Sequence, residues 1–295
     1  MEKKIGFIGL GVMGKSMAGH ILDAGYELYV YNRTRAKADE LVSRGAVWCS
    51  SPAELASKSD IIITIVGYPE DVRQVYLGEN GIAGAISEGK IAIDMTTTRP
   101  SLMLEIDSVL REKKAFFADA PVSGGDKGAR EASLSVMAGC DEEVFRLIRP
   151  VLSVMGKSIS WCGPVSMGQQ TKMCNQIVIA GTMIGVSEAL VYAAKCGLDV
   201  EAMVNTIRPG AAGCWTLDNL APRVIRGDFE PGFMIEHFIK DMGLALEEAE
   251  RMELCLPGLA LVKQLYTALK AQGLGRKGTQ ALVKALESIC RESFF

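Results

Sequence analysis

The sequence predicts an α/β fold with a doubly wound, Rossmann-type parallel sheet, followed by an all-helical domain. In the first part of the chain, short apolar runs alternate with helical patterns, as in a parallel sheet that helices cover on both faces. After Gly163 only helical patterns remain. A chain of 295 residues is long enough for two domains. We expect residues 1–163 to form the first domain and residues 164–295 the second.

The first strand is followed by a glycine-rich turn. The apolar run 5–8 leads into Gly9, Gly11 and Gly14, which have the spacing G-x-G-x-x-G. A helical pattern and a second strand at 27–31 complete a β-α-β unit, which favours a dinucleotide site over a turn without a ligand. The phosphates would bind at the helix N-terminus. The expected cofactor contacts in this turn are Gly9, Leu10, Gly11, Val12, Met13 and Gly14.

The end of the second strand indicates which dinucleotide binds. A carboxylate usually stands there to bind the ribose 2′-hydroxyl, but Asn32 stands there in this chain. Asn32 does not repel a 2′-phosphate, and Arg33 can pair with one through its planar donor fork. Thr34 and Arg35 add a hydroxyl and a second positive charge. We expect NADP(H) as the preferred cofactor. NAD(H) is the alternative, because an arginine here can also stack on adenine or stay solvated.

The alternation continues through the first domain. The run 60–66 is rich in β-branched residues, which is typical of a strand buried on both faces. In such a sheet, ligands bind outside the carboxyl ends of the strands. We expect strands at 46–48, 60–66, 90–94, 115–118, 133–137 and 158–161, and helices that begin near Ser51–Pro52, Pro69 and Pro100.

The second domain begins with a long helix over about residues 165–196. Its expected length is about 45 Å. Glu188 and other polar residues interrupt its apolar part, so we expect a buried helix that links the domains rather than a membrane span. Further helices are expected at 199–207, 216–226, 235–251, 257–272 and 277–287.

Composition argues against several classes of protein. A net charge of −3 suggests neither a nucleic-acid partner nor a membrane surface. The eight cysteines include no C-x-x-C pair and no secretory signal precedes them, which predicts free thiols in the cytoplasm. Only His20 and His237 are histidines, so a histidine-rich metal site is excluded and we expect no metal.

Two segments are candidates for substrate chemistry. Ser123, Gly124 and Gly125 follow a strand, and their hydroxyl and N–H groups could hold a small carboxylate; the alternative is an ordinary turn. Lys172 lies early on the long helix, with Gln176 one turn further on the same face. Because desolvation lowers the pKa of a lysine, Lys172 could exchange a proton near neutrality if it faces the domain cleft. A solvated surface lysine is the alternative.

A third segment, 232–241, is weaker by itself. Phe233 could form a wall of a small pocket. Lys240 and Asp241 could face the cleft, although a Lys-Asp pair on a helix is usually solvated.

Taken together, these segments resemble the β-hydroxyacid dehydrogenase family. That family includes 3-hydroxyisobutyrate dehydrogenase, tartronate semialdehyde reductase and glyoxylate/succinic semialdehyde reductase. The resemblance covers nearly the whole chain. The residues that match the family motifs are, in chain order, Gly9, Gly11 and Gly14; Val66, Gly67 and Thr97; residues 119–125; Gly163, Gly168 and Lys172; and Lys240 and Asp241.

The resemblance implies hydride transfer between a nicotinamide cofactor and a small 3-hydroxy acid or its semialdehyde. Lys172 would be the catalytic acid or base. Val66, Gly67 and Thr97 would contact the cofactor, and Lys240 would approach its nicotinamide end. Two positions depart from the family pattern. Ser166 replaces a glycine, which is harmless if the serine caps the helix. Gln176 stands where the family usually has asparagine, so either Gln176 or the adjacent Asn175 would orient the substrate.

The resemblance also implies self-association as a homodimer or homotetramer. It leaves open which acid is the substrate and which direction is physiological. Two other functions are an imine reductase on the same fold and a non-catalytic nucleotide-binding scaffold. Relatives of both kinds tend to lack the lysine, so Lys172 argues against each.

Overall fold

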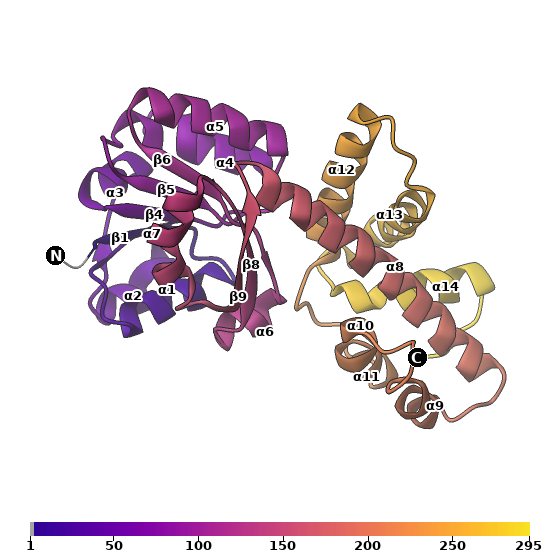
Figure 1. Cartoon of the computed structure of the whole chain (residues 1–295). Helices are drawn as coiled ribbons and strands as arrows, with labels where there is room; N and C mark the ends of the chain where they lie inside the picture. Colours follow the sequence, from indigo (N-terminus) through magenta and orange to yellow (C-terminus); the bar gives the residue numbers. More distant parts are fainter. Residues whose placement is uncertain (1–2) are drawn as a thin grey trace. The chain divides into compact units, whose positions relative to one another are not determined.

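The computed structural model describes residues 3–295 and contains two compact units (Figure 1). The first unit ends at Lys172 and the second begins at Met173. We expected the division between residues 163 and 164. The observed division falls inside the long helix α8 (Met167–Lys195), so this helix contributes its first turns to the first unit and the rest to the second.

The first unit has an α/β architecture, as the sequence predicts. Its strands are β1 (Ile5–Ile8), β2 (Leu28–Tyr31), β3 (Val47–Trp48), β4 (Ile61–Thr64), β5 (Ile91–Asp94), β6 (Phe116–Asp119), β7 (Val122–Ser123), β8 (Leu134–Gly139) and β9 (Gly156–Gly163). Its α-helices are α1 (Gly14–Asp23), α2 (Asp39–Ser43), α3 (Pro52–Lys58), α4 (Pro69–Leu77), α5 (Pro100–Glu112), α6 (Gly125–Arg130) and α7 (Glu142–Leu152).

All strands form one sheet. The order β3-β2-β1-β4-β5-β6 is parallel throughout. β8 then runs antiparallel to β6 and β7, and β9 is parallel to β8, so this end of the sheet is mixed rather than purely parallel. The strand order reverses at β1, which pairs with β2 on one side and β4 on the other. The carboxyl ends of β1 and β4 therefore form the switch point at which such sheets bind ligands.

Each face of the sheet carries an apolar core. One core includes Met17 and Ile21 of α1 and Ile148 of α7. The other includes Leu55 of α3 and Val72 of α4. Every residue of β4 is buried, as the β-branched run predicts for a strand covered on both faces.

Helix starts follow the local sequence signals. Ser51 is the N-cap of α3, and its side chain accepts a hydrogen bond from the N–H of Glu54 (3.1 Å). Pro52, Pro69 and Pro100 occupy the first turns of α3, α4 and α5, where the missing N–H costs no helical hydrogen bond.

The second unit is helical. Besides most of α8 it contains α9 (Val200–Ile207), α10 (Trp215–Asn219), α11 (Ala221–Ile225), α12 (Ile235–Arg251), α13 (Pro257–Leu269) and α14 (Val283–Cys290). The single helix expected at 216–226 is wrong. The chain breaks there into α10 and α11, because Pro222 has no N–H to continue the hydrogen bonds of α10 and lies in the first turn of α11.

Helix α8 is the central element of the second unit. Met173 and Met183 pack in one apolar core, and Val186 and Leu190 pack in another. By length and composition alone α8 could cross a membrane, but core helices of folded domains pass the same test. Its opposite side is open, and Tyr192 is exposed there.

Candidate active site

The glycine turn has the geometry of a dinucleotide cradle. Gly9 has a φ of +99°, which L side chains rarely adopt. A Cβ at Gly14 would collide with the carbonyl oxygen of Gly9, so this glycine lets α1 approach the strand. Gly11 differs, because a Cβ there would meet no atom within 4 Å. Packing therefore does not require glycine at position 11, whereas close approach of a pyrophosphate does. The turn fits a nicotinamide dinucleotide.

Asn32 links this turn to the end of β2. Its Oδ1 accepts a hydrogen bond from the N–H of Leu10 (2.9 Å), and its Nδ2 donates to the carbonyl oxygen of Thr34 (2.8 Å). Asn32 thus shapes the turn from within the protein.

The two arginines after β2 have different surroundings. Arg35 lies over the ring of Trp48, with its guanidinium carbon 4.4 Å from the ring centroid, and pairs with Asp39 at 2.7 Å. The side chain of Arg33 is 87% exposed and pairs with Asp71 at 3.1 Å. Arg33 is therefore the more accessible of the two to an anion, while Arg35 mainly packs on the surface of the unit.

A buried carboxylate positions the loops after β4 and β5. Asp94 accepts hydrogen bonds from the hydroxyls of Thr64 (2.7 Å) and Thr96 (2.8 Å). The Thr96 hydroxyl in turn accepts from the N–H of Val66 (2.9 Å). This network fixes Val66, a predicted cofactor contact, and Thr96, which precedes another predicted contact, Thr97. No local sequence pattern marks Asp94, Thr64 or Thr96 as site residues.

A second buried network holds the start of α8 against the sheet. The carboxylate of Asp119 accepts from the N–H groups of Ser166 and Gln169, both at 2.7 Å. The Gln169 side chain accepts from the N–H of Thr98 (3.0 Å) and donates to the carbonyl oxygen of Thr96 (2.7 Å). Burial raises the pKa of Asp119 to about 7, although the two N–H donors oppose this shift.

Lys172 follows Gln169 by three residues on α8 and is buried, with 6% of its surface exposed. The surface-lysine alternative is therefore wrong. Gly168 explains the close packing here, because a Cβ would lie 2.7 Å from the Asp119 carboxylate. Ser166 has a φ of +84°, and its N–H donates to Asp119. A positive φ favours glycine, which fits the glycine that the family pattern has at this position.

The predicted carboxylate-binding turn follows β6. Ser123 is half-buried in the short strand β7. Gly124 and Gly125 have φ values of +130° and +62°, so the backbone of this turn favours glycine. Helix α6 starts at Gly125, and at its end His20 of α1 lies 2.9 Å from the carbonyl oxygen of Ala129. His20 therefore connects the helix after the glycine turn to the helix after this one.

In the helical unit, Gln176 and Asp241 form a buried hydrogen bond. The Gln176 Nε2 donates to Asp241 Oδ2 (2.6 Å), and the Asn175 amide donates to Gln176 Oε1 (2.7 Å). Lys240 pairs with Asp241 at 3.0 Å. The idea of a solvated Lys-Asp pair is wrong, since the two side chains are 13% and 3% exposed.

Phe233 is partly buried, and its ring packs on Phe238 with the centroids 5.6 Å apart. Burial and the nearby Lys240 charge lower the pKa of His237.

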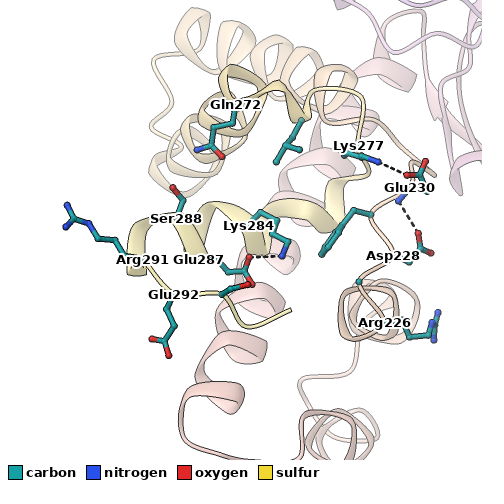
Figure 2. Close-up of a pocket in the computed structure, with 14 residues that line it drawn as sticks. Arg226, Asp228, Glu230, Gln272, Lys277, Lys284, Glu287, Ser288, Arg291 and Glu292 are labelled. Atoms are coloured by element: carbon teal, nitrogen blue, oxygen red, sulfur yellow. Dashed lines mark hydrogen bonds and ion pairs between the residues drawn. The ribbon is translucent and has the colours of Figure 1, made fainter.

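The cavity shown in Figure 2 lies elsewhere in the helical unit and has a volume of about 830 Å³. Charged side chains line it, and they pair with one another: Lys277 with Glu230 at 2.6 Å, and Lys284 with Glu287 at 2.8 Å. None of the predicted site residues lines this cavity. All eight cysteines are free thiols, and residues 3–295 contain no cluster of three His, Cys, Asp or Glu that could hold a metal ion.

Comparison with known proteins places this chain in a family. Residues 4–163 match the model for the NAD-binding domain of 6-phosphogluconate dehydrogenase. Residues 166–286 match the model described as NAD-binding of NADP-dependent 3-hydroxyisobutyrate dehydrogenase.

Whole-chain relatives agree. A probable 3-hydroxyisobutyrate dehydrogenase-like protein of Arabidopsis thaliana is 49% identical over 97% of this chain and 86% of the relative. The 2-hydroxy-3-oxopropionate reductase of Escherichia coli is 39% identical over 96% and 97%. The solved structure of Mycobacterium tuberculosis 3-hydroxyisobutyrate dehydrogenase with L-serine has a TM-score of 0.88 at 30% identity, covering 97% of this chain and 99% of that one. The chain is therefore an NAD(P)-dependent oxidoreductase that belongs to the β-hydroxyacid dehydrogenase family.

Proposed function

We propose that this protein transfers hydride reversibly between NADP(H) and a small 3-hydroxy acid or its semialdehyde, with Lys172 as the general acid or base. One observation carries the proposal. The Lys172 side chain is buried on α8, one turn after Gln169, and Gln169 binds the loop that contains Thr97. The predicted proton donor therefore lies one helical turn from the residue that holds the loop of a predicted cofactor contact.

Most of the residues that would hold the cofactor lie in the first unit. Backbone N–H groups from Gly11 to Gly14 would bind the pyrophosphate, since those of Gly9 and Leu10 donate to Tyr31 and Asn32. Arg33 and Thr34 would bind the 2′-phosphate. Val66, Gly67 and Thr97 would contact the cofactor further along the strand ends, and Lys240 of the helical unit near the nicotinamide. When bound, the cofactor supplies or accepts the hydride.

The protein itself manages the proton and the substrate. Lys172 would donate a proton to the carbonyl oxygen during reduction and take one from the hydroxyl during oxidation. Ser123, with the N–H groups of Gly124 and Gly125, would bind the substrate carboxylate. Gln176 gives one N–H to Asp241 and has a second, which would orient the reacting oxygen. Asn175, which donates to Gln176, would support it in this role.

Substrate class is supported by the relatives. The names of the Arabidopsis, Escherichia and Mycobacterium proteins all point to small hydroxy acids or oxo acids. Phe233, partly exposed and packed on Phe238, would form an apolar wall that limits substrate size. We further propose a homodimer or homotetramer, which light scattering of the purified protein would establish.

A substrate panel tests the proposal. NADPH and NADH oxidation would be followed by absorbance with succinic semialdehyde, glyoxylate, tartronate semialdehyde and methylmalonate semialdehyde, and with a cyclic imine. We expect turnover of at least one semialdehyde, faster with NADPH. Turnover of the imine alone would establish an imine reductase instead. Cofactor binding without turnover of any compound would favour the scaffold alternative.

A further inference from the structure

The cofactor-facing end of β2 has an ion pair that the proposed function does not use. Arg33 follows β2, and its Nη1 lies 3.1 Å from Oδ1 of Asp71 in the first turn of α4. The pair therefore joins the end of β2 to the helix after β4. These strands flank β1, whose glycine turn would hold the pyrophosphate. Any group that Arg33 binds from the cofactor has to compete with this carboxylate.

The neighbouring side chains are engaged elsewhere. Asn32 binds the N–H of Leu10, and Arg35 packs on Trp48. On α4, Glu70 pairs with Arg99 at 3.3 Å, and Asp71 pairs with Arg33. The net charge near the ribose 2′ position of a bound cofactor would therefore depend on Arg33 and Asp71.

The Asp71 carboxylate is held in place by the helix. Its second oxygen, Oδ2, accepts a hydrogen bond from the N–H of Tyr68 (3.2 Å), the N-cap residue of α4. A carboxylate fixed at this point in a helix cannot turn away freely when an anion approaches Arg33. It remains a negative charge beside the site that a 2′-phosphate would occupy.

We propose that Asp71 determines cofactor specificity by competing with the 2′-phosphate for Arg33. This inference rests on the proposed role of Arg33 in binding NADP(H). NADPH has to break the Arg33–Asp71 pair and place two negative charges near the carboxylate. NADH, which has a neutral 2′-hydroxyl, has to do neither. Asp71 therefore weakens NADPH binding selectively and brings the two affinities closer together.

The test measures cofactor binding directly. Dissociation constants for NADPH and NADH would be determined by nicotinamide fluorescence with the full-length protein, Asp71→Asn, Arg33→Gln and the double variant. Asparagine keeps an oxygen acceptor for the Tyr68 N–H but removes the charge. We expect Asp71→Asn to bind NADPH about 3–10-fold more tightly, since exposed charge pairs have modest energies, and to change NADH binding less than about twofold.

The double variant shows whether the effect passes through Arg33. In the Arg33→Gln background, the gain from Asp71→Asn should shrink to about twofold or less. Asp71→Glu, which restores the charge at a position where glutamate also suits the helix N-terminus, should return the affinity ratio toward that of the unmodified protein. Equal changes for NADPH and NADH in Asp71→Asn, or no change for either, would overturn the proposal.

A matched control removes a carboxylate from a similar surface pair. Glu105 pairs with Arg73, which lies two residues after Asp71 on α4. Glu105→Gln should leave the NADPH-to-NADH affinity ratio unchanged. If it raises the ratio as much as Asp71→Asn, the effect is general electrostatics and the specific role of Asp71 is wrong.

The result separates this inference from the proposed function. We expect Arg33→Gln to weaken NADPH binding about tenfold or more without weakening NADH binding to that degree. If Arg33→Gln leaves the ratio unchanged, the NADP(H) preference in the proposed function is wrong. If it lowers the ratio but Asp71→Asn has no effect, only the role of Asp71 is wrong.

Discussion

The two stretches of α8 on either side of the unit boundary are held in different ways. Before the boundary, a buried carboxylate, Asp119, binds backbone N–H groups of the helix start. After the boundary, Gln176 binds Asp241 through side chains, and Asp241 also pairs with Lys240. The first arrangement fixes the backbone that carries Lys172. The second fixes individual side chains and balances a buried charge. Substitutions in the first stretch should therefore change catalysis and the pH dependence of stability, whereas those in the second should lower stability itself.

The largest expected effect is on catalysis at the end of the first stretch. Lys172→Ala should lower kcat about 10²–10⁴-fold, because it removes the proposed proton donor. The dissociation constant for NADPH should change less than about twofold, since the glycine turn and Arg33 are untouched. Steady-state kinetics and fluorescence titration measure the two quantities. A kcat equal to that of the unmodified protein would refute the role of Lys172.

The second stretch should show a loss of stability. Asp241→Ala leaves the mostly buried Lys240 without this carboxylate and Gln176 without its acceptor. We expect the free energy of unfolding to fall by about 3 kcal/mol, as when one partner of a buried pair is removed. Asp241→Asn keeps an oxygen for Gln176 and should lose clearly less. Urea unfolding measures both, and equal losses would show that the hydrogen bond contributes nothing.

The first stretch should instead respond to pH. Asp119 has a pKa of about 7 in the folded protein and the ordinary value of 3.8 when unfolded. Between pH 3.8 and about pH 7, the folded state therefore binds a proton on Asp119 that the unfolded state has already lost. Its contribution to stability is complete below about pH 4 and is lost as the pH rises through 7. From pH 5 to pH 8 the free energy of unfolding should fall by about 2–3 kcal/mol from this group.

Asp119→Asn is the variant that isolates this contribution. An amide does not titrate, so the variant should lose the Asp119 part of the pH dependence, even though it also loses one acceptor for the helix N–H groups. Urea unfolding at pH 5 and pH 8 gives the slope for each protein. The same slope in both would assign the pH dependence to other groups.

The smallest expected effect is a gain in the free energy of unfolding. Ser166 adopts a φ of +84° at the start of α8, which is strained for any residue with a Cβ. Ser166→Gly should raise the free energy of unfolding by about 1 kcal/mol, the strain relief being partly offset by the greater freedom of glycine in the unfolded chain. Ser166→Ala retains the strain and serves as the control. A gain of equal size in the alanine variant would point to the hydroxyl instead.

Local patterns predicted the elements that depend on neighbours in sequence. The glycine turn, the buried strand β4 and the proline-initiated helices were all confirmed, because their geometry is set within a few residues. The split of 216–226 into two helices could also have been predicted from Pro222. Gln169 had a weaker signal. It precedes Lys172 by three residues and therefore shares a helix face with it and with Gln176.

The partners of the site residues were not predictable in this way. The residues near Arg33 and Arg35 in sequence do not indicate that Arg33 pairs with Asp71 or that Arg35 packs on Trp48. Asp94 and Asp119 end their strands and have no local feature that marks them as acceptors for the loops after β4 and β5 and for the start of α8. The contacts of Arg33 with Asp71, of Asp94 with Thr64 and of Asp119 with the start of α8 join residues about 30 to 50 positions apart, and strand order brings them together.

By itself, the sequence determined the fold class, the dinucleotide turn and the family, since each depends on short-range spacing of glycine, apolar and catalytic residue types. The tertiary structure decided which side chains are engaged: Lys172 is buried, Arg35 is packed on an aromatic ring, and Arg33 faces a competing carboxylate. The physical reason is that charge and burial are properties of three-dimensional neighbours, and the parallel sheet brings those neighbours from distant parts of the chain.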